Sequence, residues 1–132
     1  MSGVATAPAM AAPTSTGRPR VLVLSREYPN RVAELNGMWV ERLVRASARF
    51  CEPRVIAPVP YMPPLPGAGY YQQFRAIDQR ENVNGIEVLR PRFVIAPGSY
   101  FRGTEAASYY ARMRGRVDRL RSDFPFELIH AH

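Results

Sequence analysis

The sequence contains no lysine, a single cysteine (Cys51) and no long run of apolar residues. One cysteine excludes an internal disulfide framework, and no apolar run approaches the ~18–20 residues that a membrane-spanning helix needs. Hydrophobic residues still make up 46% of the 132 residues, which is enough for a core and too many for a wholly disordered chain. These limits predict one small folded domain, or part of one.

The positive charge of the chain comes from arginine alone: 18 basic residues stand against 11 acidic ones, for a net charge of +7. A balance of this kind favours nucleic acid or an acidic membrane as a partner. The arginines are spread from Arg18 to Arg121 among the acids, however, so the sequence contains no basic patch. The missing lysine indicates a general bias towards arginine and alanine. We therefore expect no nucleic-acid partner.

The first 17 residues carry no charged side chain and consist almost entirely of Ala, Pro, Ser, Thr and Gly. Such a segment cannot bury enough apolar surface to offset its chain entropy. It also lacks the basic start and the continuous apolar stretch of a secretory signal. We therefore expect residues 1–17 to form a disordered tail, residues 18–132 to hold the folded part, and the protein to be cytoplasmic.

Residues 20–57 have the pattern of a strand, a helix and a second strand. The run Val21–Leu24 is short and apolar on both faces, which is typical of a strand buried in a parallel sheet. A helix is expected over residues 38–50, where Glu41 and Arg45 form a favourable pair on the polar face. Its apolar face is predicted to hold Val40, Leu43, Val44, Ser47 and Phe50. Residues 53–57 form the second strand and complete one β-α-β unit.

Residues 58–84 are expected to be irregular, because five prolines fall between Pro58 and Pro66. The Asn84-Gly85 turn introduces a third strand at residues 86–90, and a second loop follows up to residue 103. A second helix is expected from an N-cap at Thr104 to Phe124, and a fourth strand at residues 126–130. The apolar face of this helix is predicted to hold Ala106, Tyr110, Met113, Val117, Leu120 and Phe124.

These elements predict an α/β fold: the first four strands of an incomplete Rossmann-like, doubly wound parallel sheet. The common order of such a sheet places the third, second, first and fourth strands side by side. Ligands bind outside the carboxyl ends of the strands where the crossovers diverge, which here is between the first and fourth strands. The loop at residues 25–37 and the segment His130–His132 are therefore expected to border a site.

Gly37 and His132 have the clearest chemical potential in this region. Gly37 stands at a helix start, where free backbone N–H groups favour an anion, although a glycine there is also a common turn residue. His132 titrates near neutrality and suits a hydrogen-bond donor or proton shuttle, with an exposed polar residue as the alternative. His130 lies on the same side of the strand, but no third ligand is near, so no metal site is expected. Cys51 is expected to be a partly buried small residue.

Four segments, in this order and spacing, resemble the opening of the glycosyltransferase family 4 enzymes. The first comprises residues 20–29 (RVLVLSREYP) and 36–42 (NGMWVER), in which Trp39 takes the place of the family's usual Phe. Residues 55–60 (VIAPVP) resemble the family's second strand, and residues 84–92 (NGIEVLRPR) resemble its third. Residues 126–132 (FELIHAH) resemble the fourth, with Glu127 at the family's Asp position.

The resemblance implies a GT-B fold, in which two Rossmann-like domains bind a nucleotide-sugar donor between them and the N-terminal domain receives the acceptor. It implies that His132 is the catalytic residue beside the transferred sugar and that Asn36 and Gly37 lie near the donor phosphates and the acceptor. His130, Arg26 and Glu27 are further candidates for this site. Members of the family usually retain the anomeric configuration and need no catalytic metal; we expect no cofactor here. They often build lipid-linked or exported polysaccharides at the cytoplasmic face of the membrane.

The family's donor-binding residues lie beyond the segments that this sequence contains. We therefore expect residues 18–132 to be a partial, acceptor-side domain of such an enzyme, inactive as a transferase by itself and with an open sheet edge at the fourth strand. The alternative is a non-enzymatic α/β binding module. Arg112, Arg116 and Arg119, on the arginine face of the second helix, would suit either protein for the anionic inner face of the cytoplasmic membrane, with a solvated helix face as the alternative that the pattern favours.

Overall fold

The computed structural model describes residues 17–62, 69–95 and 102–132, which form a five-stranded sheet, a two-stranded sheet and three α-helices. In spatial order the larger sheet consists of β4 (Arg80–Val83), β5 (Ile86–Leu89), β2 (Glu52–Ile56), β1 (Arg20–Leu24) and β7 (Leu128–Ala131). The smaller sheet pairs β3 (Val59–Tyr61) with β6 (Arg92–Val94). The tail predicted for residues 1–17 lies outside the described residues except for Gly17.

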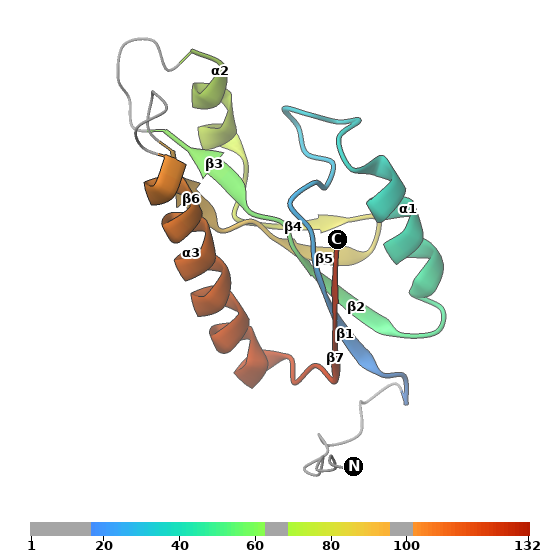
Figure 1. The fold of residues 1–132 in the computed structure, drawn as a ribbon. Helices are drawn as coiled ribbons and strands as arrows, with labels where there is room; N and C mark the ends of the chain where they lie inside the picture. The colour runs from blue at the N-terminus through green and yellow to red at the C-terminus, as the bar shows by residue number, and fades with distance from the viewer. Residues whose placement is uncertain (1–16, 63–68, 96–101) are drawn as a thin grey trace.

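The predicted order of the four parallel strands is confirmed. β5, β2, β1 and β7 lie side by side and parallel, and they are the third, second, first and fourth strands of the sequence analysis. β4 adds an antiparallel neighbour to β5 that the sequence pattern does not predict, so the sheet is mixed. Figure 1 shows β7 beside β1 at the other edge of the sheet.

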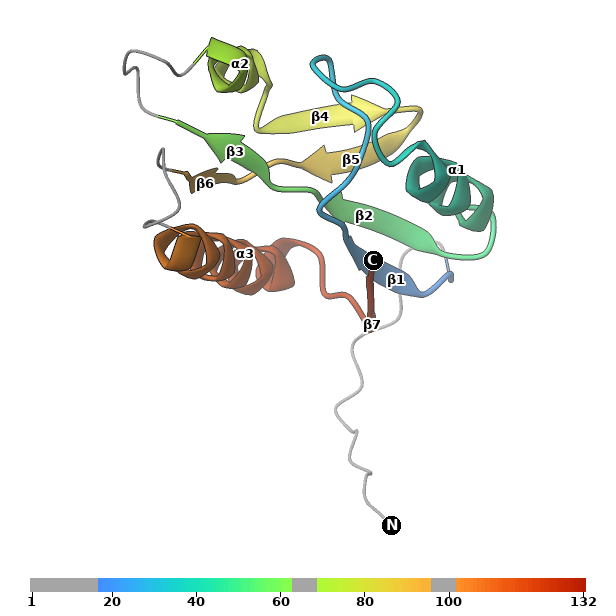
Figure 2. The ribbon, with the colours of Figure 1, turned by 45° about the horizontal axis from the view of Figure 1, so that its top comes forward.

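Helices cover both faces of the larger sheet: α1 (Met38–Ser47) lies on one face and α3 (Arg102–Asp123) on the other, as Figures 1 and 2 show. Successive residues of a strand point to opposite faces. Val23 therefore packs in the core under α1, whereas Leu22 packs in the core under α3. A strand buried on both faces needs apolar side chains at every position, which explains the continuous apolar run of β1.

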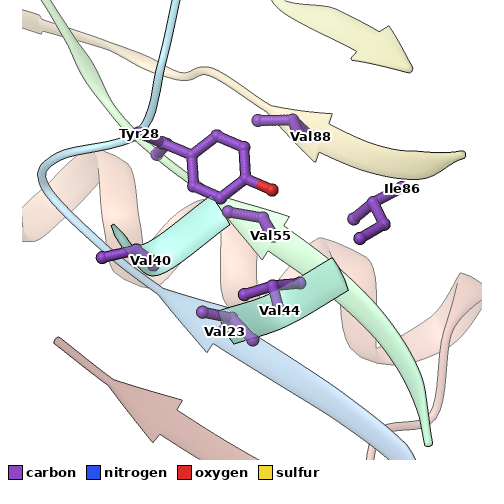
Figure 3. Close-up of a cluster of buried hydrophobic side chains, with 8 residues drawn as sticks. Val23, Tyr28, Val40, Val44, Val55, Ile86 and Val88 are labelled. Atoms are coloured by element: carbon purple, nitrogen blue, oxygen red, sulfur yellow. The ribbon is translucent and has the colours of Figure 1, made fainter. Parts of the chain in front are cut away.

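The core under α1 is shown in Figure 3. Val40 and Val44 of the helix pack with Val23 and with valines of β2 and β5. Tyr28, from the loop after β1, is only 1% exposed and lies in the same cluster. This tyrosine therefore anchors the start of the loop in the core.

The helix predicted for residues 38–50 ends at Ser47 and buries a different set of side chains. Leu43 is 45% exposed and Phe50 is 67% exposed, so both residues were wrongly placed on the buried face. Glu41, expected on the polar face, is only 6% exposed. Its burial is possible because its Oε1 accepts a 2.8 Å hydrogen bond from Asn84 Nδ2, which a helix pattern cannot reveal.

The prediction that residues 58–84 are irregular is wrong for most of their described part. This segment contains β3, a short helix α2 (Gly69–Gln72), a 3-10 helix η2 (Gln73–Ala76) and β4. Proline is tolerated in β3 because the residues on either side of Pro60 make the backbone hydrogen bonds to β6 and its flanking residues. Val59 N–H donates to the Pro91 carbonyl, and the Tyr61 carbonyl accepts from Ile95 N–H, so the missing N–H of Pro60 costs no bond. Residues 63–68 lie outside the described residues.

The second predicted helix is present, with a different start and partly different contacts. α3 begins at Arg102, so Thr104 lies inside the helix and is not its N-cap. Tyr110 is 64% exposed, and its neighbour Tyr109 packs instead, with its ring 5.1 Å from that of Phe93. Phe93 belongs to β6, which falls within the predicted loop at residues 91–103. Packing against this extra strand therefore places Tyr109, rather than the predicted Tyr110, on the buried face of the first turns of α3.

None of the described helices combines the length and the apolar character needed to cross a membrane. The fourth predicted strand is present as β7, which begins at Leu128 rather than at residue 126. Leu128 is 59% exposed and Ile129 is 44% exposed, in agreement with the expected uncovered edge. Cys51 is a free, partly buried thiol, as expected.

Candidate functional site

The two segments that were expected to border a site meet at the carboxyl ends of β1 and β7. Parallel pairing of the two strands brings Ala131 opposite Leu24. His132 follows directly, and its backbone N–H donates a 2.8 Å hydrogen bond to the Leu24 carbonyl. The loop after β1 begins at the next residue, Ser25, so the histidine lies beside the start of that loop.

The start of this loop is held by hydrogen bonds within it and to β2. Ser25 is 2% exposed, and its backbone N–H donates to the Ile56 carbonyl at 3.1 Å. Its hydroxyl donates to the Glu27 carbonyl at 2.6 Å and accepts from the Glu27 N–H at 3.3 Å. A short side chain that bonds the backbone two residues ahead tightens a turn. The turn leaves the side chains of Arg26 and Glu27 exposed.

Gly37 connects the end of this loop to α1 at very short range. Its φ is +72°, in the left-handed region, and a Cβ built on it would lie 2.4 Å from the carbonyl carbon of Glu27 and 2.7 Å from Tyr28 N. Only glycine fits, because both the backbone angle and the space exclude a side chain. The Gly37 carbonyl accepts from the N–H groups of Val40 and Glu41, and Met38 N–H donates to Leu35. Packing therefore accounts for this glycine, and most first-turn donors are already bonded.

Trp39 and the two histidines form an aromatic cluster over the site. The Trp39 and His132 rings meet edge to face, with centroids 5.2 Å apart, and the His130 ring lies 4.2 Å from His132. Trp39 is 59% exposed, so the cluster faces outward. Partial desolvation and, to a lesser extent, the charge of His130 lower the pKa of His132 below its ordinary value of 6.5. The imidazole of His132 is therefore mainly neutral at neutral pH.

Arg26 connects the loop to the first turn of α3. One of its Nη atoms lies 3.4 Å from Glu105 Oε1, and its guanidinium carbon lies 5.9 Å from the ring centroids of both Phe93 and Tyr109. The Arg26 side chain is 67% exposed, so the ion pair with Glu105 contributes little to stability. The guanidinium charge of Arg26 therefore remains accessible at the surface of the loop.

Two neighbouring hollows share the side chains of Arg26 and Glu27. The smaller, of about 260 Å³, is lined by Ser25, Arg26, Glu27, Trp39, Val40 and His132. The larger, of about 430 Å³, contains Asn36 and three aromatic residues from α2 and η2, namely Tyr70, Tyr71 and Phe74. The structure thus brings His132 to Arg26 and Glu27, and Asn36 to the same two residues from the other side. Neither Gly37 nor His130 lines either hollow.

Arg90 supports the site from below and was missed by the sequence analysis, which treats it as the end of a strand. Its side chain is fully buried, and Nη2 donates a 2.7 Å hydrogen bond to the Pro29 carbonyl in the loop. Its Nε lies 3.4 Å from Glu81 Oε2. Burial lowers the pKa of Arg90, and Glu81 opposes that shift. An arginine directly after an apolar strand was the available signal, because such a charge must either leave the core or find a partner.

Tyr28 is a buried neighbour of Arg90 that the sequence analysis also missed as a residue of the site. Burial raises the pKa of its hydroxyl to about 12, and the nearby Glu41 carboxylate adds to the increase. The hydroxyl has no hydrogen-bond partner among the residues that the structure describes. The aromatic ring, rather than the hydroxyl, therefore holds the loop to the core.

No group of three or more His, Cys, Asp or Glu side chains within residues 17–62, 69–95 and 102–132 is arranged to hold a metal ion. Arg112, Arg116 and Arg119 lie further along α3 and line neither of the two hollows. Comparisons with protein-family models, with curated proteins and with solved structures find no match to this chain.

Proposed function

We propose that this chain is the acceptor-side part of a retaining glycosyltransferase with the GT-B fold of glycosyltransferase family 4. Four parallel strands in the order of a doubly wound sheet, with helices on opposite faces, support the Rossmann-like interpretation of its fold. Such an enzyme moves a sugar from a nucleotide sugar to a lipid-linked or polysaccharide acceptor. The nucleoside diphosphate leaves as the new glycosidic bond forms.

The observation that carries the proposal is the meeting of His132 with the loop after β1. His132 directly follows β7, an edge strand of the larger sheet, and it lines one hollow together with Arg26 and Glu27. A ligand seated there would lie outside the carboxyl ends of β1 and β7, which is where doubly wound sheets bind ligands. We assign the sugar position to this hollow and the acceptor to the adjoining hollow beside Asn36.

The residues of this site would act by position and electrostatics. A neutral imidazole at His132 can donate a hydrogen bond to a sugar hydroxyl while its other nitrogen accepts one. Arg26 would offset negative charge on the departing phosphates, and Gly37 keeps the loop close to α1 so that these groups stay in place. The resemblance implies that a second domain of such an enzyme binds the donor, so we expect residues 18–132 by themselves to turn over no nucleotide sugar.

Fluorescence of Trp39 tests the proposed site, because this residue is the single tryptophan of the chain and touches His132. We expect a millimolar uridine, guanosine or adenosine diphosphate sugar to change its emission, and the change to disappear in His132→Ala and Asn36→Ala. Arg49→Gln is the control, because Arg49 follows the C-terminus of α1 whereas Trp39 lies in the first turn of this helix. This variant should respond like the original chain. A lack of response to every nucleotide sugar would refute the sugar position assigned to this hollow, and an equal loss in the control would show that the emission does not report on the hollow.

A further inference from the structure

A second concave surface lies between α3 and the β3–β6 pair, away from the site described above. It is a groove of about 380 Å³, and four arginines line it: Arg92, Arg112, Arg116 and Arg119. Tyr61 and Gly115 are among the other lining residues, and no described carboxylate is one of them. A groove with several positive groups and no negative one is suited to an anionic ligand.

The four arginines come from both walls of the groove. Arg112, Arg116 and Arg119 are four and three residues apart, which places them along one stripe of α3. Arg92 belongs to β6 and faces them from the other wall. Gly115 leaves the helix surface open between them, because a Cβ built there would meet no atom within 4 Å. Sequence spacing identifies the helical stripe, whereas the partner from β6 appears only in the fold.

Arg92 is held in place by protein groups. One of its Nη atoms donates to the carbonyls of Arg75 and Ile77, at 3.0 and 3.4 Å, and its guanidinium carbon lies 6.0 Å from the ring centroid of Tyr61. Its Nε is buried and has no hydrogen-bond partner in the described part of the chain. Backbone carbonyls and the Tyr61 ring thus hold this guanidinium in place at one wall of the groove.

Ion pairs among the described residues involve Arg20, Arg26, Arg45, Arg54, Arg80 and Arg90, which lie in or next to the larger sheet, in the loop after β1 and in α1. None of the four groove arginines takes part in them. Bringing like charges around one hollow is unfavourable unless a counter-charge offsets them. The groove therefore has positive charge that the described part of the protein does not neutralise.

We propose that this groove is a binding site for a phosphate-bearing ligand. The planar guanidinium group donates paired hydrogen bonds that match phosphate oxygens, and three or four such groups would surround one or two phosphates. The site is separate from the proposed sugar hollow: Arg112 follows Glu105, the α3 residue that touches Arg26, by about two helical turns. The proposal therefore does not depend on the proposed transferase function.

Inorganic pyrophosphate, followed by isothermal titration calorimetry at low and at raised salt, is the first probe. We expect saturable binding with one pyrophosphate per chain, weakened by salt because the contacts are charge-assisted. Vesicles of phosphatidylglycerol and phosphatidylcholine in equal parts are the second probe, in a sedimentation assay with and without pyrophosphate. Pyrophosphate binding without sedimentation assigns the site to a soluble phosphate, and sedimentation that pyrophosphate blocks assigns it to a lipid headgroup.

Matched variants distinguish a discrete site from diffuse positive charge. Arg116→Gln should lower the affinity about tenfold, which corresponds to one charge-assisted hydrogen bond. Arg114→Gln removes the same charge from the same helix outside the groove lining and should change affinity less than about twofold. Gly115→Glu places a carboxylate among the arginines and should abolish binding, whereas Gly115→Ala should not, because the space there is open.

Each of these measurements can overturn the proposal. Failure of both probes to bind, with circular dichroism showing a folded chain, refutes a phosphate site. Equal effects of Arg114→Gln and Arg116→Gln refute a discrete groove and indicate attraction by net charge alone. Binding that survives Gly115→Glu in a folded variant places the anion elsewhere. Loss of the Trp39 response to nucleotide sugars, by contrast, bears on the proposed function and leaves this result unaffected.

Discussion

The Cα of Gly37 lies so close to Glu27 that a Cβ on the glycine would stand 2.4 Å from the Glu27 carbonyl oxygen. This contact joins the two ends of the loop between β1 and α1. Both elements are anchored in the core by Val23 and Val40, so neither backbone can retreat without disturbing that packing. The shape of the candidate site therefore depends on the absence of one side chain.

Gly37→Ala tests this contact. Because alanine strains the left-handed conformation and also collides with backbone, we expect the free energy of unfolding to fall by more than about 2 kcal/mol. Urea denaturation measures the loss. Gly85→Ala is the matched control, since Gly85 also has a positive φ of +86° but has open space around a built Cβ. Equal losses in the two variants would show that the close approach is unimportant.

Arg90→Met tests the support beneath the loop. The substitution removes the buried donor to the Pro29 carbonyl and leaves that oxygen without its partner, so we expect a loss of about 2–4 kcal/mol in unfolding free energy. Arg80→Met is the control, because the Arg80 side chain is 71% exposed and its pair with Glu87 should contribute at most about 1 kcal/mol. A loss no larger for Arg90→Met than for Arg80→Met contradicts a supporting role.

Tyr28 is expected to make the fold sensitive to alkali. The fold holds the neutral phenol, whose pKa rises from 10.0 to about 12, so this contribution to stability is complete below pH 10.0 and is lost as the pH rises towards 12. The chain has no lysine to titrate in that range. Tyr28→Phe should reduce the late step of the tyrosinate absorbance, to which Tyr109 also contributes because burial raises its pKa too. An unchanged late step in Tyr28→Phe would contradict this assignment.

His132 should titrate below the ordinary histidine value. Nuclear magnetic resonance of its ring, with Trp39 emission as a second readout, should give a midpoint below 6.5. Because the unfolded chain binds this proton more readily, the contribution of His132 to stability is present above 6.5 and is lost as the pH falls from 6.5 through the lower pKa of the folded chain. His130→Gln should move the midpoint upward by removing the neighbouring charge. A midpoint at or above 6.5 in the original chain argues against the packing with Trp39.

Much of the larger sheet could be predicted from local patterns. Val21–Leu24 shows a doubly buried strand because every residue is apolar, and the turn at Asn84-Gly85 appears where Asn84 adopts a φ of +53°. The smaller sheet could not be predicted in this way. β3 and β6 are three residues each, contain or follow prolines, and owe their pairing to one another rather than to their own periodicity.

The residues of the candidate site likewise fall into those that the sequence reveals and those that only the fold reveals. The sequence identifies Gly37 and His132, since a glycine at a helix start and a histidine at a strand end are visible in the order of residues. The functions of Arg90, Glu41 and Arg92 are not visible there. Each is a charged side chain whose environment is decided by a residue far away in the chain: Pro29 for Arg90, Asn84 for Glu41 and Ile77 for Arg92.

By itself, then, the sequence determined the four parallel strands of the larger sheet, the two helices that cover it, and the burial of β1 on both faces. Side-chain size, backbone freedom and local periodicity settle such features within a few residues. Only the tertiary structure decided which charges are buried, that Trp39 contacts His132 edge to face, and that Arg92 completes an arginine groove on α3. Electrostatic and packing partners are chosen by proximity in space, and this proximity exists only after the chain has folded.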